Sequence, residues 1–304
     1  MSVTASLPPQ RPFGAVLTAM VTPFTVDGEI DLDSAQRVAA HLVDEGNDGL
    51  VVAGTTGESP TLAEEEHDAL LRAVVEAVGD RAVVVAGSGN NDTHHSVLRA
   101  QAAEKTGVHG LLVVTPYYSK PPQEGLVRHF RTVADSTGLP VMVYDIPGRT
   151  GVALSTATLL RLGEHPRIVA VKDAKDDLFA ASQVMAGSEL AWYSGSDQLN
   201  LAHLTQGAAG IVSVVGHVAG RQYAAMVRAV DAGDLTTAVS LHRRLLPAVE
   251  TLMTTTQGAI MAKAAVQLTG VVTNRTMRSP LVDATDEEVN LLRAALRRCD
   301  LLPG

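Results

Sequence analysis

The 304-residue chain contains one cysteine, Cys299, so it cannot form an intramolecular disulfide, a CxxC redox pair or a cysteine-rich metal site. A chain without disulfides fits a reducing compartment, and we expect a cytoplasmic protein. The first residues, MSVTASLPPQRPFG, lack a basic start followed by an apolar core, so no secretory signal is predicted.

Basic residues are also scarce. Lys and Arg total 24 against 33 Asp and Glu, which gives a formal net charge of −9, and the basic residues form no block. This charge argues against partners such as nucleic acid or an anionic membrane surface. No apolar run reaches the ~18 residues that a membrane helix needs. Small-molecule chemistry is the favoured class, and 46% apolar residues suffice for a large core.

What the chain does contain is a regular alternation of two patterns. Short apolar runs lack the polar alternation of half-exposed strands, as is typical of parallel strands covered on both faces. Amphipathic stretches separate them; in residues 70–78 the apolar side chains share one helical face. Thr61 and Glu64 predict a capping box at the start of that helix. The eight apolar runs are AVLTAM, GLVVAG, AVVVAG, GLLVVT, VMVYDI, RIVAVKD, LAWYSG and AGIVSVV.

Eight strand–helix units of roughly 20 to 34 residues predict an α/β protein, a (β/α)8 TIM barrel. An open doubly wound sheet is the alternative, but no GxGxxG follows the first strand. After Gly220 only helical patterns remain. We therefore expect a flexible N-terminal arm (1–12), a catalytic barrel (13–233) and a C-terminal helical domain (234–304) that packs against the barrel or a second subunit.

Reacting groups of barrel enzymes lie at the carboxyl ends of the strands. The sixth run ends in Lys172, which follows four apolar residues in a strand expected to be covered on both faces. Desolvation disfavours the charged form of such a lysine. A lysine with a pKa of ~10.4 is a free amine in about one molecule in 2500 at pH 7, so a neutral nucleophile needs a pKa lowered by ~3. Imine formation with a carbonyl substrate requires such a group. The alternative is an amine that reaches solvent at the strand end.

Other strand ends supply candidate partners for this lysine. Tyr144 ends the preceding strand and could carry protons, and Thr55 and Thr56 follow the second strand, where one could bind a carboxylate and the other relay a proton to Tyr144. A core tyrosine and a helix-capping threonine are the alternative interpretations. Signatures of a phosphate-binding loop, a catalytic metal site and a serine nucleophile are missing from the sequence, and no metal is expected.

Four strings, GLVVAGTTGESPTL, VTPYYSKPPQEGL, VYDIPGRTG and VAVKDA, resemble the dihydrodipicolinate synthase group of the pyruvate-dependent Schiff-base lyases and aldolases. They occur in the family's order, from about residue 13 onward. The resemblance implies a (β/α)8 barrel with a C-terminal helical domain. It also implies condensation of pyruvate with L-aspartate 4-semialdehyde in the lysine and diaminopimelate pathway, without metal or organic cofactor.

The resemblance also implies residue roles. Lys172 would form the imine with pyruvate, and Tyr144 would be the acid/base. Thr55 would link Tyr144 to Tyr118, which in this family comes from the neighbouring subunit, and Thr56 would hold the pyruvate carboxylate together with Thr55.

Three further positions follow from the same resemblance. Arg149 would grip the carboxylate of the aldehyde substrate. Gly195 and the main-chain carbonyl of Val212 would line the pocket. The role of Tyr118 requires at least a homodimer, and the family is usually a tetramer.

One set of residues departs from the family pattern. Feedback-regulated relatives bind lysine at a dimer interface, where a histidine is expected in place of Glu64 and an acid in place of His95. We therefore expect weak or absent lysine inhibition. The positions that match this effector site are Ser59, Pro60, Glu64, His67, Asn91, His95 and Tyr117.

Two other functions stay open at this point. A sugar-acid or sialate aldolase would use the same lysine imine, although those relatives generally lack an arginine at position 149. A barrel that binds a keto acid without turnover would be expected to lose the lysine or the tyrosine, and both are present.

Overall fold

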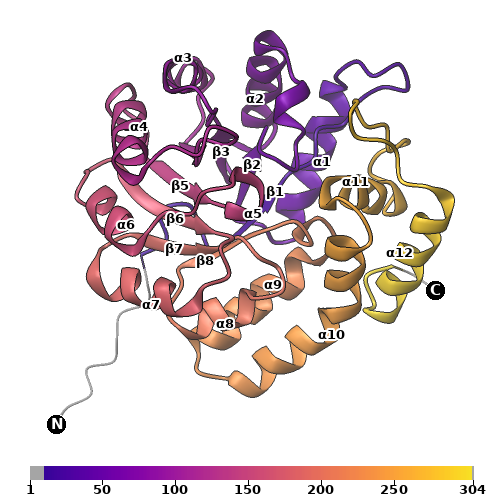
Figure 1. Ribbon diagram of the computed structural model, residues 1–304. Helices are drawn as coiled ribbons and strands as arrows, with labels where there is room; N and C mark the ends of the chain where they lie inside the picture. The colour runs from indigo at the N-terminus through magenta and orange to yellow at the C-terminus, as the bar shows by residue number, and fades with distance from the viewer. Residues whose placement is uncertain (1–9, 303–304) are drawn as a thin grey trace.

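The structure is a computed structural model in which residues 10–302 are described. Eight parallel strands close into a barrel in chain order, β1 to β8, which confirms the predicted (β/α)8 architecture (Figure 1). The strands are β1 Val16–Ala19, β2 Gly49–Val52, β3 Val83–Gly87, β4 Gly110–Val114, β5 Val141–Asp145, β6 Ile168–Asp173, β7 Ala191–Ser194 and β8 Gly210–Ser213.

Helices follow every strand and surround the barrel. None of the described helices is long and apolar enough to span a membrane. The barrel helices are α1 Leu32–Asp44, α2 Glu64–Val78, α3 Thr93–Glu104, α4 Gln123–Asp135, the short α5 Pro147–Thr150, α6 Thr156–Gly163, α7 Leu178–Gly187, α8 Asn200–Thr205 and α9 Gly216–Asp231.

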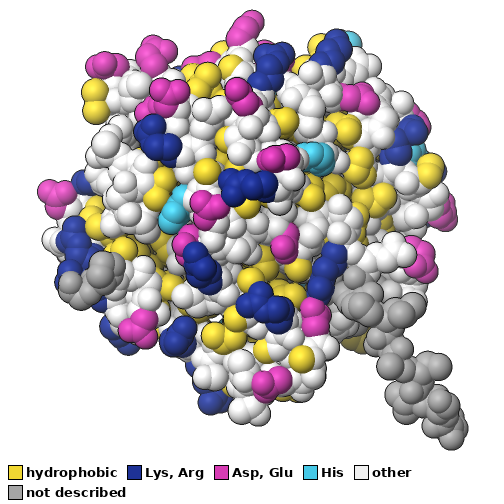
Figure 2. All heavy atoms as spheres, turned by 180° about the vertical axis from the view of Figure 1, so that it is seen from behind, with side chains coloured by type: hydrophobic (Ala, Val, Ile, Leu, Met, Phe, Trp, Pro, Cys, Tyr) yellow, Lys and Arg dark blue, Asp and Glu magenta, His cyan; other side chains and the backbone are white. Residues whose placement is uncertain are grey.

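Three further helices, α10 Leu235–Thr254, α11 Gly258–Leu268 and α12 Asp286–Arg298, form the C-terminal segment. Helices α10 and α11 pack on α9, and α12 packs on α10 and α11. Figure 1 shows all three on one side of the barrel. On the opposite view of the molecule, acidic and basic side chains are interspersed (Figure 2).

Side-chain alternation along the strands divides the core into two layers. The outer layer lies between barrel and helices, and includes Val141 and Val143 of β5. The inner layer fills the barrel and includes Met142 and Tyr144 of the same strand. Lys172 lies two residues after Ala170, a member of the inner layer, so the strand period directs the lysine into the barrel as well.

The N-terminal end of the barrel is closed by Phe13, which packs edge-on against Tyr193 with ring centroids 6.3 Å apart. Arg11, part of the expected flexible arm, donates to the carbonyl of Ala209 and forms an ion pair with Asp231. Residues 1–9 of that arm lie outside the described residues. The reacting end of the barrel is therefore the opposite one, where the strands have their carboxyl ends.

The predicted capping box at Thr61 and Glu64 is wrong. Helix α2 begins at Glu64 with Ala63 as its N-cap, and the Glu66 carboxylate accepts a hydrogen bond from the Ala63 N–H at 2.9 Å. Thr61 instead ends a 3-10 turn, η1 Ser59–Thr61, where its hydroxyl donates to the carbonyl of Glu58. This turn delays the helix by two residues.

Candidate active site

Lys172 and Tyr144 lie next to each other inside the carboxyl end of the barrel. They are paired in register between β5 and β6. The Lys172 Nζ lies 4.2 Å from the centre of the Tyr144 ring, and each residue is only 5% exposed. The amine is therefore enclosed and does not reach into solvent.

Burial lowers the pKa of Lys172 to about 8; the Asp197 carboxylate opposes this effect and the Arg149 guanidinium reinforces it. At pH 7 a group with this pKa is uncharged in about one molecule in ten, several hundred times more than an exposed lysine. The barrel thus supplies most of the activation that an amine nucleophile requires.

The environment of Tyr144 favours the neutral, protonated form of its phenol. Burial raises its pKa to about 12, against the charge of Arg149 and a hydrogen bond with the Thr55 side chain, which both lower it. The phenol therefore keeps its proton at neutral pH. Its hydrogen bond with Thr55 connects the phenol to the loop after β2.

Thr55 and Thr56 occupy a tightly constrained loop between β2 and α2. The loop is bracketed by two non-glycine residues with positive φ, Ala53 at 53° and Glu58 at 57°. The Gly57 carbonyl accepts from the hydroxyl of Thr22 at 2.7 Å. Such backbone conformations persist only where the surroundings impose them, and they cluster at functional sites.

Gly195, directly after β7, is adjacent to the lysine. A Cβ at this position would lie 3.0 Å from Lys172 Cγ and 3.1 Å from its Cε. These contacts are close, so a side chain at this position would require the lysine side chain to shift by a few tenths of an ångström. Val212 lies in β8, and its buried side chain belongs to the inner layer of the core.

A cavity of about 510 Å³ opens next to this site. Tyr118 lines it, although its side chain is 89% exposed and its φ is +72°. The cavity continues from Thr55, in the loop after β2, to most of the positions expected to bind an effector. Its lining consists of Thr55, Ser59, Pro60, Leu62, Glu64, Gly89, Asn90, His95, Arg99, Val114, Tyr117, Tyr118, Ile146, Arg149 and Thr150.

Two of the expected effector residues do not line this cavity. The ring of His67 is buried, with Nε2 3.0 Å from the carbonyl oxygen of Gly87. Asn90 lines the cavity in place of its neighbour Asn91, which is exposed. The remaining expected positions, Ser59, Pro60, Glu64, His95 and Tyr117, are brought together.

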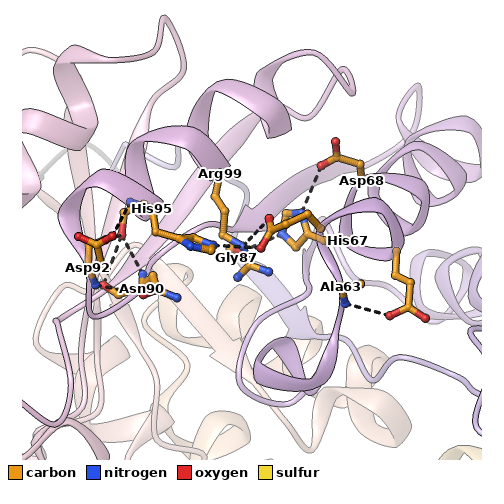
Figure 3. A network of polar contacts seen from close by, with 11 residues as sticks. Ala63, His67, Asp68, Gly87, Asn90, Asp92, His95 and Arg99 are labelled. Atoms are coloured by element: carbon orange, nitrogen blue, oxygen red, sulfur yellow. Dashed lines mark hydrogen bonds and ion pairs between the residues drawn. The ribbon is translucent and has the colours of Figure 1, made fainter.

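Glu64 and His95 are bonded to each other in this cavity. Nε2 of His95 lies 3.0 Å from one Glu64 oxygen, and Arg99 donates to the other at 3.2 Å. His95 and Arg99 both belong to α3 (Figure 3). Partial burial raises the pKa of Glu64, but Arg99 and His95 outweigh it and hold the pKa below its ordinary value. The carboxylate is therefore ionised and already paired.

Asp197, two residues after Gly195, was not predicted from the sequence as part of the site. Its buried carboxylate accepts from the hydroxyl of Ser213, from the Asn200 amide at 3.0 Å, and from the backbone N–H groups of Val214 and Val215 at 2.8 and 3.0 Å. Asp197 therefore fixes the end of β8 and places a negative charge near Lys172. The sequence signal for Asp197 is an acidic residue two positions after the glycine that follows β7.

Residues 12–299 match the Dihydrodipicolinate synthetase family. A 4-hydroxy-tetrahydrodipicolinate synthase of Kineococcus radiotolerans is 62% identical over all of this chain and 99% of its own length. One from Acidothermus cellulolyticus is 61% identical over 96% of this chain and 94% of its own. The crystal structure of the enzyme from Cyanidioschyzon merolae with lysine bound, 40% identical, superposes with a TM-score of 0.93 over 96% of this chain and 100% of that chain. The chain belongs to the dihydrodipicolinate synthetase family.

Proposed function

We propose that this protein condenses pyruvate with L-aspartate 4-semialdehyde through an imine on Lys172, in the pathway to diaminopimelate and lysine. The observation that carries the proposal is a buried amine with a pKa of about 8, in contact with Tyr144 inside the barrel. The names of the full-length relatives support the choice of reaction.

The proposed chemistry requires no group beyond those of the chain and its substrates. The neutral Nζ of Lys172 attacks the keto carbon of pyruvate, and loss of water from the adduct leaves a protonated imine. Loss of a proton from the pyruvate methyl group then gives an enamine, whose carbon bonds to the aldehyde carbon of the second substrate while the aldehyde oxygen takes up a proton. The amino group of that substrate then attacks the imine carbon and releases the Lys172 amine. Tyr144 gives and takes the protons of the enamine step and of the carbon–carbon bond formation, with Thr55 as its hydrogen-bonded neighbour.

The remaining site residues bind and orient the substrates in this proposal. Thr55 and Thr56 hold the pyruvate carboxylate on a rigid loop, and Gly195 and the Val212 carbonyl line the same pocket. Arg149, at the cavity, binds the carboxylate of the aldehyde substrate through its planar fork.

A homo-oligomer is part of the proposal. Tyr118 is highly exposed on a backbone with positive φ, which is difficult to explain within one chain and fits insertion into a neighbouring subunit. We assign at least a dimer, with a tetramer as the expected assembly. The free, buried thiol of Cys299 fits a cytoplasmic location.

The test is reduction with borohydride in the presence of pyruvate, followed by intact mass and peptide mapping. One reduced pyruvate adduct on Lys172, together with turnover of aspartate semialdehyde, is the expected result. Turnover of a sugar acid or sialate in place of the semialdehyde would reassign the protein to the sibling aldolases. An adduct-free protein, or an adduct on a surface lysine such as Lys175, would refute the imine mechanism.

Imine formation is expected to depend on pH through Lys172. Since only the neutral amine attacks, its rate should rise about tenfold per pH unit below pH 8 and level off above it. Quenched-flow trapping of the pyruvate adduct between pH 6 and 9.5 measures this profile. A rate that still rises tenfold per unit at pH 9.5 would mean that the lysine retains an ordinary pKa.

Lysine is expected to inhibit this enzyme weakly or not at all. The ammonium group of a bound lysine would compete with Arg99 and His95 for the Glu64 carboxylate. The double variant Glu64→His/His95→Glu restores the residues expected in feedback-regulated relatives and should gain inhibition. Inhibition of the unmodified enzyme by sub-millimolar lysine in the condensation assay would contradict the prediction.

A further inference from the structure

Glu58 follows the catalytic threonines closely and is held by the C-terminal helical segment. Its carboxylate forms a buried ion pair with Lys263 of α11, and both residues are 2% exposed. The Lys263 ammonium also donates to the carbonyl of Thr276 at 2.8 Å. This pair connects residues 205 positions apart in the chain.

Arg278, in the connection between α11 and α12, binds the same loop at several points. Its backbone N–H donates to the second Glu58 oxygen at 2.9 Å. Its guanidinium donates to both Glu66 oxygens at 2.7 and 2.6 Å, and to the carbonyl of Thr61 at 2.9 Å. The segment from residue 58 to 66 is thus fixed at its beginning, middle and end.

Phe24, in the connection between β1 and α1, contacts both cations. Lys263 Nζ is 4.3 Å and Arg278 Cζ 4.4 Å from the centre of its ring, within the range of cation–π attraction. Three segments that are distant in sequence therefore meet at the loop that carries Thr55 and Thr56.

A buried ion pair is not in itself evidence of stability, because apolar residues of similar volume often replace both partners without loss. Removal of one partner alone is costly, since it leaves a buried charge unpaired. What distinguishes this pair is its position. Glu58 has a left-handed backbone, and its N–H donates to the carbonyl of Thr55 at 3.2 Å. A residue in this conformation needs imposed contacts, and its two carboxylate oxygens are both bonded to the C-terminal segment.

We propose that Glu58 and Lys263 are positioning residues for the pyruvate site: the C-terminal segment, through this buried pair, holds Thr55 and Thr56 where they bind the keto-acid carboxylate and contact Tyr144. The inference rests on the proposed function. It assigns the C-terminal helices a part in substrate binding that packing alone would not give them.

The test is Lys263→Met, which keeps most of the side-chain volume and removes the charge. Because a displacement of about 1 Å is enough to impair a reaction, the KM for pyruvate should rise and kcat should fall, each by about 10- to 100-fold. The KM for aspartate semialdehyde should change less than about twofold, since Arg149 lies on α5, which follows a different strand. A purely structural role would reduce the active fraction and leave both KM values unchanged.

Arg275→Met is the matched control. Arg275 also anchors the C-terminal segment, through Ala284, Gln267 and Asp286, and within residues 10–302 none of its hydrogen bonds or ion pairs involves the loop after β2. This variant should lose thermal stability and keep the KM for pyruvate. Active sites are counted by borohydride trapping, so that partly unfolded protein does not distort kcat.

If Lys263→Met does not fold, the second variant is Glu58→Gln, measured at reduced temperature. It keeps the side-chain shape and the hydrogen-bond acceptor for Arg278. The same result is expected, a raised KM for pyruvate and a nearly unchanged KM for aspartate semialdehyde. Pyruvate KM values equal to that of the unmodified enzyme in the folded variants would overturn the inference. Its failure remains distinct from failure of the proposed function, since the latter appears as an unmodified enzyme that forms no pyruvate adduct on Lys172.

Discussion

Replacement of Lys172 by methionine is expected to abolish condensation, with kcat lowered by about 10⁴-fold or more, because the proposed imine forms on this amine. Methionine fills similar space beside Gly195 and Tyr144, so the barrel should stay folded. Borohydride reduction with pyruvate should leave the variant without an adduct. The control Lys105→Met removes an exposed lysine at the end of α3 and should keep both activity and trapping.

The same variant is expected to be more stable than the unmodified protein at neutral pH. The difference between a lysine pKa of 10.5 and one of about 8 corresponds to about 3 kcal/mol against the charged form in the folded state. Methionine does not carry this cost, and Asp197 keeps its four hydrogen bonds when the lysine is gone. Urea denaturation at pH 7 should therefore show a gain of about 1–3 kcal/mol.

The pH dependence of this gain has a definite sign. The folded-state pKa of Lys172 lies below the unfolded value, so the unfolded chain binds more protons between pH 8 and 10.5. The destabilisation is complete below pH 8 and disappears as the pH rises toward 10.5. The advantage of Lys172→Met should shrink over that interval. A variant less stable than the unmodified protein at pH 7 would show that burial of the Lys172 amine does not lower the free energy of unfolding.

The fold was predictable because its determinants are local. A strand buried on both faces must be apolar throughout, and eight such runs separated by amphipathic stretches leave few architectures. The burial of Lys172 near the carboxyl end of its strand was predictable for the same reason, since a charged residue is unusual in an apolar strand. The start of α2 was not predicted, because the η1 turn that displaces it depends on the contacts of Glu58 with α11.

The supporting residues of the site were not visible in the sequence. Asp197 resembles any acid of a surface loop until β8 brings Ser213 and two backbone N–H groups to it. Lys263 resembles an ordinary helical lysine, and only the folding of α11 onto the barrel shows its partner. Sequence patterns reveal residues that are unusual among their neighbours along the chain. They do not reveal residues whose role depends on partners that only folding brings near.

Replacement of Tyr144 by phenylalanine is expected to separate the two halves of the reaction. The ring that contacts Lys172 remains, so pyruvate should still form a reducible adduct on the lysine. Only the proton carrier is lost, and kcat for condensation should fall by about 10²- to 10⁴-fold.

Tyr193→Phe is the matched control for this experiment. Tyr193 also points into the barrel, but its hydroxyl lies at the closed end, where it donates to the Gly14 carbonyl at 3.0 Å and accepts from the Phe13 N–H at 3.2 Å. Its loss should lower the thermal midpoint and leave kcat within about twofold, because its hydroxyl bonds only to the backbone at the end of the barrel opposite to the proposed reaction. If Tyr144→Phe kept full condensation activity, the proton carrier would have to be another group. If it lost adduct formation as well, the phenol would act already in the attack on pyruvate, and the separation of steps proposed here would not hold.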